Sequence, residues 1–184
     1  MALQNYPMRA WAAGPPPVTA FDMEQLSAAI RDLDNRAASL EAGASRRVAS
    51  AASAATGSNM SFGTSEAVGA WLQPNLSAGR RYRTRMTFVA NATTAGTNGF
   101  FRLEQTVGTT VGTGGTLIPG GQAAPNLSRG AAGDNSPVSI EGEFVASQSG
   151  VHTIAFTGRS GAGTVNVPAD AANHAWLFTV DDVT

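Results

Sequence analysis

A heptad pattern of apolar residues between residues 18 and 55 is the feature of this 184-residue chain that most constrains its fold. Its apolar positions lie alternately three and four residues apart, which is the spacing of the a and d positions of a coiled coil. A seam this narrow cannot bury itself, so the helix needs a partner. The a positions fall on Met23, Ile30, Ala37 and Ala44, and the d positions on Leu26, Leu33 and Leu40.

Charged residues beside the seam favour association between parallel copies of the chain. Arg36 falls at a g position and Glu41 at the following e position, a spacing that pairs opposite charges between parallel helices. Isoleucine at a with leucine at d favours a coiled coil of two helices. A trimer would therefore depend on the rest of the chain. The alternative is an amphipathic helix that packs on the globular part of its own chain.

The pattern changes phase after residue 44. Arg47 takes the next d position, and the apolar stripe resumes after a four-residue shift, as in a stutter. The resumed stripe consists of Val48, Ala51 and Ala55. We predict a coiled-coil stalk helix over residues 18–57, ending at the glycine at 57.

Residues 1–17 are predicted to form an extended arm. Proline fixes φ and lacks an N–H, so three consecutive prolines exclude a helix before residue 18. Aromatic side chains on such an arm suit docking onto another protein, and the alternative is an unattached terminus. The residues concerned are Tyr6, Trp11, Pro15, Pro16 and Pro17.

Residues 58–184 change to a period of two, which predicts a β-domain. Short strands with no helix between them indicate an antiparallel sandwich or barrel. The clearest hairpin joins 138–146 to 150–158 across SQSG, and the polar stretch 107–137 reads as a long loop with short edge strands near 109–111 and 117–118. The other predicted strands are 68–72, 82–90, 100–106, 164–167 and 174–183. The predicted fold class is therefore mainly β, a jelly-roll-like antiparallel sandwich preceded by an arm and one coiled-coil helix.

The composition excludes several classes of function. The net charge is −1 without blocks of like charge, so we expect neither nucleic acid nor a membrane surface as a partner. There is no run of about 18 apolar residues and no signal-peptide pattern, so we expect no membrane insertion. Without cysteine the chain can form no disulfide, thiolate metal site or cysteine nucleophile.

No set of residues predicts catalysis or a cofactor. His152 and His174 lack a third metal ligand at a familiar spacing, and GRSGAGT at 158–164 lacks the lysine and helix of a phosphate loop. Glu141 and Glu143 share one strand face, where solvation explains them better than acid–base chemistry. The basic cluster is explained better by ion pairs with glutamates on neighbouring strands than by nucleic-acid binding. It consists of Arg80, Arg81, Arg83 and Arg85.

Three segments carry a resemblance to the trimeric fibre and appendage proteins of tailed bacteriophages. GPPPVTAFDMEQLSAAIRDLDNRAASLE is similar to the stem openings of fibres from actinobacterial phages. The strand YRTRMTFVA with FFRLEQTVGTTVG resembles their jelly roll, and HAWLFTVDDV resembles their closing strand. The resemblance implies a virion protein with a threefold jelly-roll head, a coiled coil that sets the symmetry, and an arm that attaches to other virion proteins.

The sequence therefore predicts a non-enzymatic virion structural protein. In this interpretation a homotrimeric fibre is attached by its arm and presents its head to a host-surface glycan, with a minor capsid or head fibre as the alternative. A second alternative, from a different class, is a carbohydrate-binding module. That function needs an exposed aromatic platform, whereas the strand patterns place Trp71, Tyr82 and Trp176 in the core.

Overall fold

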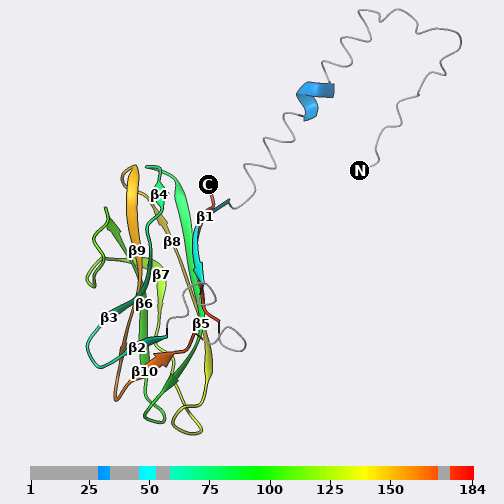
Figure 1. The fold of residues 1–184 in the computed structure, drawn as a ribbon. Coiled ribbons are helices and arrows are strands. Elements are labelled where there is room, and N and C mark those ends of the chain that lie inside the picture. The colour runs from blue at the N-terminus through cyan, green and yellow to red at the C-terminus, as the bar shows by residue number, and fades with distance from the viewer. Residues whose placement is uncertain (1–28, 34–45, 53–58, 170–174) are drawn as a thin grey trace, which may run out of the picture. The chain divides into compact units, whose positions relative to one another are not determined.

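The chain divides into two compact units, Met1–Gly43 and Ala44–Thr184. The structure, a computed structural model, describes residues 29–33, 46–52, 59–169 and 175–184 (Figure 1). The described residues of the first unit, 29–33, are helical, and those of the second unit form a β-sandwich. No helix among the described residues has the length and apolar character needed to cross a membrane.

The described part of the second unit contains eleven strands. They are β1 (Arg46–Ala52), β2 (Met60–Phe62), β3 (Ala67–Leu72), β4 (Asn75–Leu76), β5 (Arg81–Ala92), β6 (Gly99–Val107), β7 (Thr116–Ala123), β8 (Ser136–Val145), β9 (Gly150–Ser160), β10 (Val165–Val167) and β11 (Leu177–Asp182). Every strand pair is antiparallel. The predicted mainly β fold class is confirmed.

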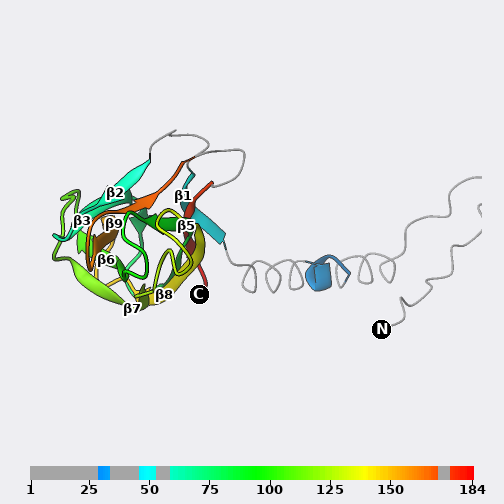
Figure 2. The ribbon, with the colours of Figure 1, turned by 90° about the horizontal axis from the view of Figure 1, so that it is seen from below.

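The main strands form two sheets with the order of a jelly roll. The β5 sheet runs β1-β11-β5-β8, and β10 and β2 extend it beside the end of β5. The β9 sheet runs β3-β9-β6-β7, with β4 also paired to β9. Two four-stranded sheets in this order are the eight-stranded double Greek key of a jelly roll. Figure 2, seen from below, shows the two sheets facing each other.

The burial of β5 follows from its alternating sequence. Tyr82, Thr84, Met86, Phe88 and Ala90 are buried, and the residues between them, two of them arginines, are not. This is the alternation of a strand with one solvated face. The predicted strand at 82–90 is confirmed.

Four phenylalanines from both sheets form the centre of the core. Phe101 on β6 lies 4.8 Å from Phe88 on β5 and 5.7 Å from Phe156 on β9, measured between ring centroids. Phe62 on β2 meets Phe101 and Phe156 edge-on. Edge-to-face and offset aromatic pairs each add about 0.5–1.5 kcal/mol beyond the area that they bury. The cluster therefore joins the β5 sheet to the β9 sheet.

Glycine allows β7 and β8 to meet at one edge of the sandwich, where Figure 2 shows them side by side. The pairing of β7 with β6 is irregular, because Arg102 faces Gln122 while Glu104 faces Leu117. The β7 residues between Leu117 and Gln122 lie close to Gly142 on β8. A Cβ at residue 142 would lie 2.6 Å from the carbonyl oxygen of Pro119. The contact therefore excludes any side chain at residue 142.

The stalk helix predicted over 18–57 is wrong for residues 46–52, which form β1. This strand pairs with β11, and Arg47 forms an ion pair with Asp181 at 2.5 Å. Val48, Ala49 and Ala51 pack against the core. Alanine has a high helix propensity, but pairing with β11 and burial against the core override it. Residues 29–33 are helical as predicted, and the remainder of 18–57 lies outside the described residues.

The hairpin predicted between 138–146 and 150–158 is also wrong. The two strands exist, but β8 pairs with β5 and β9 pairs with β3 and β6. The SQSG segment therefore connects one sheet to the other. Local turn signals do not reveal this, because a strand's partner depends on which faces it buries. Of the short strands predicted inside 107–137, 117–118 belongs to β7 and 109–111 is not a strand.

We expect the substitution Gly142→Ala to lower the melting temperature by several degrees. The added methyl group meets backbone atoms of β7, which cannot rotate away, and overpacking of this kind costs about 1–3 kcal/mol. Gly63→Ala is the control, because a Cβ at residue 63 meets nothing within 4 Å. Equal melting temperatures for the two variants would show that the β7–β8 contact is not tight.

Candidate functional site: the outer face of the β9 sheet

The outer face of the β9 sheet is covered by polar groups and one large aromatic side chain. Ile154 and Phe156 of β9 point into the core, so Thr153, Ala155 and Thr157 lie on the outer face. All three are nevertheless buried. Side chains from neighbouring elements therefore form an outer layer over this strand.

Trp71 is the exposed aromatic of this layer. It lies opposite Ala155 in the β3–β9 pair, while its neighbours Ala70 and Leu72 are buried. The indole is 50% exposed. The prediction that Trp71, Tyr82 and Trp176 all belong to the core is confirmed for Tyr82 and Trp176, but it is wrong for Trp71. The segment VGAWL contains only apolar residues and glycine, so its period does not show which face is buried.

Hydrogen-bonding side chains lie on both sides of Trp71 along the strand direction. On one side, the Gln73 amide Nε2 donates to the hydroxyl of Thr153 (3.3 Å) and to the carbonyl of Thr109 (2.9 Å). On the other side, Glu66 accepts from the Thr157 hydroxyl at 3.0 Å and lies 3.5 Å from Arg102. Amide, carboxylate and guanidinium groups thus flank the exposed indole.

A buried carboxylate fixes a glycine-rich loop on the same face. Glu104 lies on β6, opposite Ala155, and is only 4% exposed. Its Oε2 accepts the backbone N–H groups of Gly114 (3.0 Å) and Gly115 (3.1 Å). At the other end of this loop, the Thr153 hydroxyl donates to the carbonyl of Gly108 at 2.8 Å. The loop 108–115 is therefore attached to the outer face at both of its ends.

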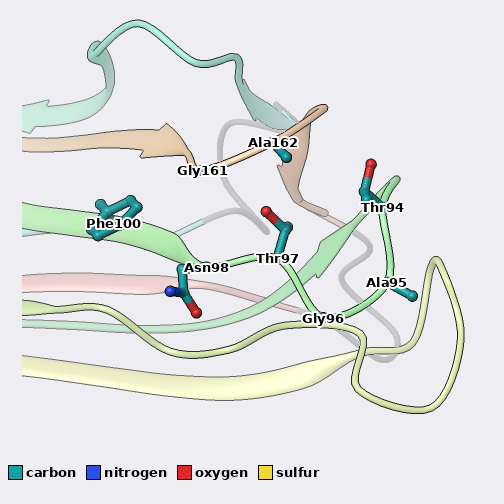
Figure 3. Close-up of a pocket in the computed structure, with 8 residues that line it drawn as sticks. All are labelled: Thr94, Ala95, Gly96, Thr97, Asn98, Phe100, Gly161 and Ala162. Carbon is teal, nitrogen blue, oxygen red and sulfur yellow. The ribbon is translucent and has the colours of Figure 1, made fainter.

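A pocket of about 350 Å³ lies at the β5–β6 turn, next to the turn between β9 and β10 (Figure 3). Figure 3 shows Thr97, Asn98 and Phe100 on one side of it and the turn at Gly161 and Ala162 on the other. Phe100 pairs with Arg159 of β9, and the guanidinium carbon lies 4.2 Å from the ring centroid. Thr94, Ala95 and Gly96 complete the lining.

The loop that lines this pocket is held from behind by hydrogen bonds to residues 126–128. The Gly96 N–H donates to the carbonyl of Leu127 at 3.1 Å, and the Asn126 amide donates to the Gly96 carbonyl at 2.6 Å. Asn126 also donates to Oδ1 of Asn98 at 3.1 Å. This last bond fixes the orientation of the Asn98 amide, whose nitrogen then remains as a donor.

The outer face of the β5 sheet has a different chemistry, because it carries ion pairs between strands. Arg83 donates to Glu143 at 2.8 Å and Arg85 donates to Glu141 at 2.6 Å. The hydrogen bond to Glu143 raises the pKa of Arg83. These contacts confirm the interpretation as ion pairs between strands for Arg83 and Arg85, and they account for both glutamates.

Arg80, the first arginine of the cluster, also has an acidic partner. Its Nε lies 2.8 Å from Oδ2 of Asp182. Burial raises the pKa of Asp182, but hydrogen bonds from Thr184 and Arg80 outweigh this effect, so the net pKa lies below the usual value of an aspartate. The carboxyl group is therefore charged at neutral pH.

Most of the sequence-predicted association residues lie outside the described part of the chain. Ile30 and Leu33, at heptad positions a and d, are 50% and 62% exposed on their helical segment. The other oligomerisation residues, Met23, Leu26, Arg36, Ala37, Leu40, Glu41 and Ala44, and the docking residues, Tyr6, Trp11, Pro15, Pro16 and Pro17, lie outside it. Their roles remain predictions.

Sequence reasoning missed the outer face of the β9 sheet as a site. A signal existed in FFRLEQT, where Phe101 and Leu103 alternate with Arg102 and Glu104 and so place the charges outward. The partners of those charges could not be predicted, because Glu66, just before β3, is distant in sequence and the Glu104 contact is with loop backbone.

Comparisons with known proteins reveal only distant likenesses in fold. No family model and no curated protein matches the chain. Among solved structures, a carbohydrate-binding module of Cellvibrio mixtus lichenase 5A in complex with cellotriose is 16% identical, with a TM-score of 0.32, over 76% of this chain and 96% of that one. With a TM-score below 0.5, this likeness supports no argument about function.

Two further solved structures are similar at the same level. The insecticidal delta-endotoxin Cry8Ea1 of Bacillus thuringiensis is 14% identical with a TM-score of 0.37, over 66% of this chain and 19% of the toxin. Eiger TNF from S. frugiperda is 12% identical with a TM-score of 0.35, over 58% of this chain and 62% of that one. The chain therefore spans less than two thirds of the length of either protein, and neither likeness supports a functional argument.

We expect Glu104→Ala to release the loop 108–115 while the sandwich stays folded. A hydrogen bond to a charged group contributes about 1.5–3 kcal/mol, so amide exchange at Gly114 and Gly115 should accelerate by about tenfold or more. Hydrogen–deuterium exchange measures this directly. Glu143→Ala, which removes a half-buried, ion-paired carboxylate from the other sheet, should leave the loop unchanged. Unaltered exchange in Glu104→Ala would show that other contacts hold the loop.

Proposed function

We propose that this chain is a non-enzymatic attachment protein whose jelly-roll head binds surface glycans through the outer face of the β9 sheet. The observation that carries the proposal is the half-exposed indole of Trp71 among hydrogen-bonding side chains on that face. Tyr82 and Trp176 are buried, so among these three aromatic side chains only Trp71 is available to a ligand at the surface.

The arrangement suits a sugar for two physical reasons. The C–H groups on one face of a pyranose ring make an apolar surface, and a rigid indole buries that surface at little cost in conformational entropy. The sugar hydroxyl groups require donors and acceptors around the ring, which the Gln73 amide and the Glu66–Arg102 pair offer on either side of Trp71. An aromatic surface with flanking polar groups therefore matches both parts of a carbohydrate.

We further propose that the protein is a homotrimeric appendage of a bacteriophage virion, attached by its N-terminal arm. The phage-fibre resemblance of the sequence supports this assignment, as does the exposure of Ile30 and Leu33 on their helical segment. Apolar residues at a and d positions that are exposed in a single chain are suited to burial against helices of other copies. A location on the tail or on the capsid fits equally well.

Joining weak glycan sites in one particle increases the overall affinity through effective concentration.

The glycan proposal predicts that Trp71→Ala lowers glycan affinity at least tenfold. A loss of about 1.4 kcal/mol corresponds to tenfold in the dissociation constant, and aromatic anchors at binding surfaces usually contribute more than this. A glycan array followed by calorimetry on the best-bound oligosaccharide measures the effect. Leu177→Ala is the matched control, because Leu177 is an exposed apolar side chain on the β5 sheet.

Two results would contradict the glycan proposal. Wild-type protein that binds no glycan saturably on the array would remove it altogether. Equal affinities for Trp71→Ala and wild type would move the binding site away from the outer face of the β9 sheet.

The oligomer proposal predicts that the double substitution Ile30→Asp and Leu33→Asp dissociates the trimer. Burying two carboxylates in a coiled-coil seam is strongly unfavourable. The mass of the full chain, measured by light scattering, should fall from that of three copies to that of one. Arg31→Ala should leave the mass unchanged. A wild-type protein that is monomeric at micromolar concentration would refute the trimer and leave the glycan proposal standing.

A further inference from the structure

The aromatic surface at Trp71 and the pocket at Phe100 lie on the same face of the β9 sheet. Trp71 is opposite Ala155, and Phe100 is opposite Arg159. The positions of the two aromatic residues are therefore four residues apart along β9. At about 3.3 Å per residue this corresponds to roughly 13 Å, with the Glu66–Arg102 pair at the intermediate level of Thr157. One oligosaccharide of a few units is long enough to contact both.

Arg159 differs from four arginines that lie on the outer faces of the two sheets. Arg102, Arg47, Arg83 and Arg85 each have a carboxylate partner within ion-pair distance. Within the described part of the chain, Arg159 has no carboxylate partner. Its contact is with the ring of Phe100, whose face attracts the guanidinium cation. Stacking orients the planar group, and its N–H donors make no hydrogen bond to any residue that the structure describes.

The remaining polar groups of the pocket suit an anionic ligand. The pocket contains no acidic side chain among its lining residues. The Thr97 hydroxyl and the Asn98 amide nitrogen have no hydrogen-bond partner among the described residues. Both residues line the pocket, and Figure 3 shows the Thr97 side chain directed toward the turn at Gly161 and Ala162 and the Asn98 side chain directed away from it. Arg159 does not line the pocket itself, but its guanidinium lies over the ring of Phe100, which does. This guanidinium beside the pocket, with the amide nitrogen and the hydroxyl of the lining, forms a set of donors that a carboxylate satisfies best.

We propose that the pocket binds a carboxylated sugar unit, such as a uronic acid, of the same glycan that stacks on Trp71. The inference rests on the proposed function and defines its substrate class as acidic glycans. The carboxylate of the sugar pairs with the fork of N–H groups on Arg159, and its hydroxyls bond to Asn98 and Thr97. The ring edge of Phe100 supplies an apolar contact within the pocket.

The experiment compares oligogalacturonides with the same oligosaccharides after reduction of their carboxyl groups, and sialylated glycans with their desialylated counterparts. Binding to full-length protein and its variants is measured by array and by calorimetry. In at least one of the two pairs, the wild-type protein should bind the acidic glycan at least tenfold more tightly than its neutral counterpart. This difference in affinity should decrease as the NaCl concentration rises. Arg159→Gln should remove the preference, whereas Arg85→Gln, on the outer face of the β5 sheet, should retain it.

Asn98→Ala is a second variant on the exposed pocket loop, and its effect should have the same direction as that of Arg159→Gln but be smaller. Melting curves establish that each variant is folded. If neutral glycans bind as well as acidic ones, or if Arg159→Gln keeps the acidic preference, the inference is overturned while Trp71-dependent glycan binding still stands. Sulfated glycans bound in place of carboxylated ones would also overturn it. Absence of any saturable glycan binding would refute the proposed function itself.

Discussion

The contact between the phenylalanine rings of β5, β6 and β9 is the interaction on which the rest of the head depends. Phe88 belongs to one sheet, Phe101 and Phe156 to the other, and their rings meet within 6 Å of one another between centroids. Because side chains alternate along a strand, burying these rings fixes which residues face outward. Ala155 and Thr157 on the outer face, and therefore the position of Trp71 opposite Ala155, follow from the inward orientation of Phe156.

The two outer faces of the sandwich divide the polar residues into different roles. On the β5 sheet, arginines and glutamates neutralise one another across β5 and β8, and exposed pairs of this kind contribute little to stability. On the β9 sheet, Glu104 instead fixes a loop, Arg102 pairs with Glu66, and Arg159 lies over the ring of Phe100. The second face is therefore the one with polar groups and aromatic surface available to a ligand.

The sequence predicted the strands best where burial and polarity alternate without ambiguity. Residues 82–90 are such a case, because large apolar residues and arginines take turns. The prediction failed at 46–52, where alanine suits a helix or a strand and the pairing with β11 decides the outcome. It failed again at Trp71, whose neighbours are apolar or glycine on both faces, and at the supposed hairpin, whose two strands are buried in different sheets. The pocket at Phe100 could not be predicted, since it requires the tertiary contact between two turns.

The place of β1 in the β5 sheet has a mechanical consequence. The chain enters the head as an edge strand that is hydrogen-bonded along β11 and clamped by Arg47 and Asp181. Tension applied through the preceding residues therefore reaches the head at this ladder, before it reaches the phenylalanine cluster. If the ladder separates, the edge of β11 becomes exposed while β5, β6 and β9 keep their contacts. Rupture would thus begin at β1 and spare the outer face of the β9 sheet, which is the face that we propose binds glycans.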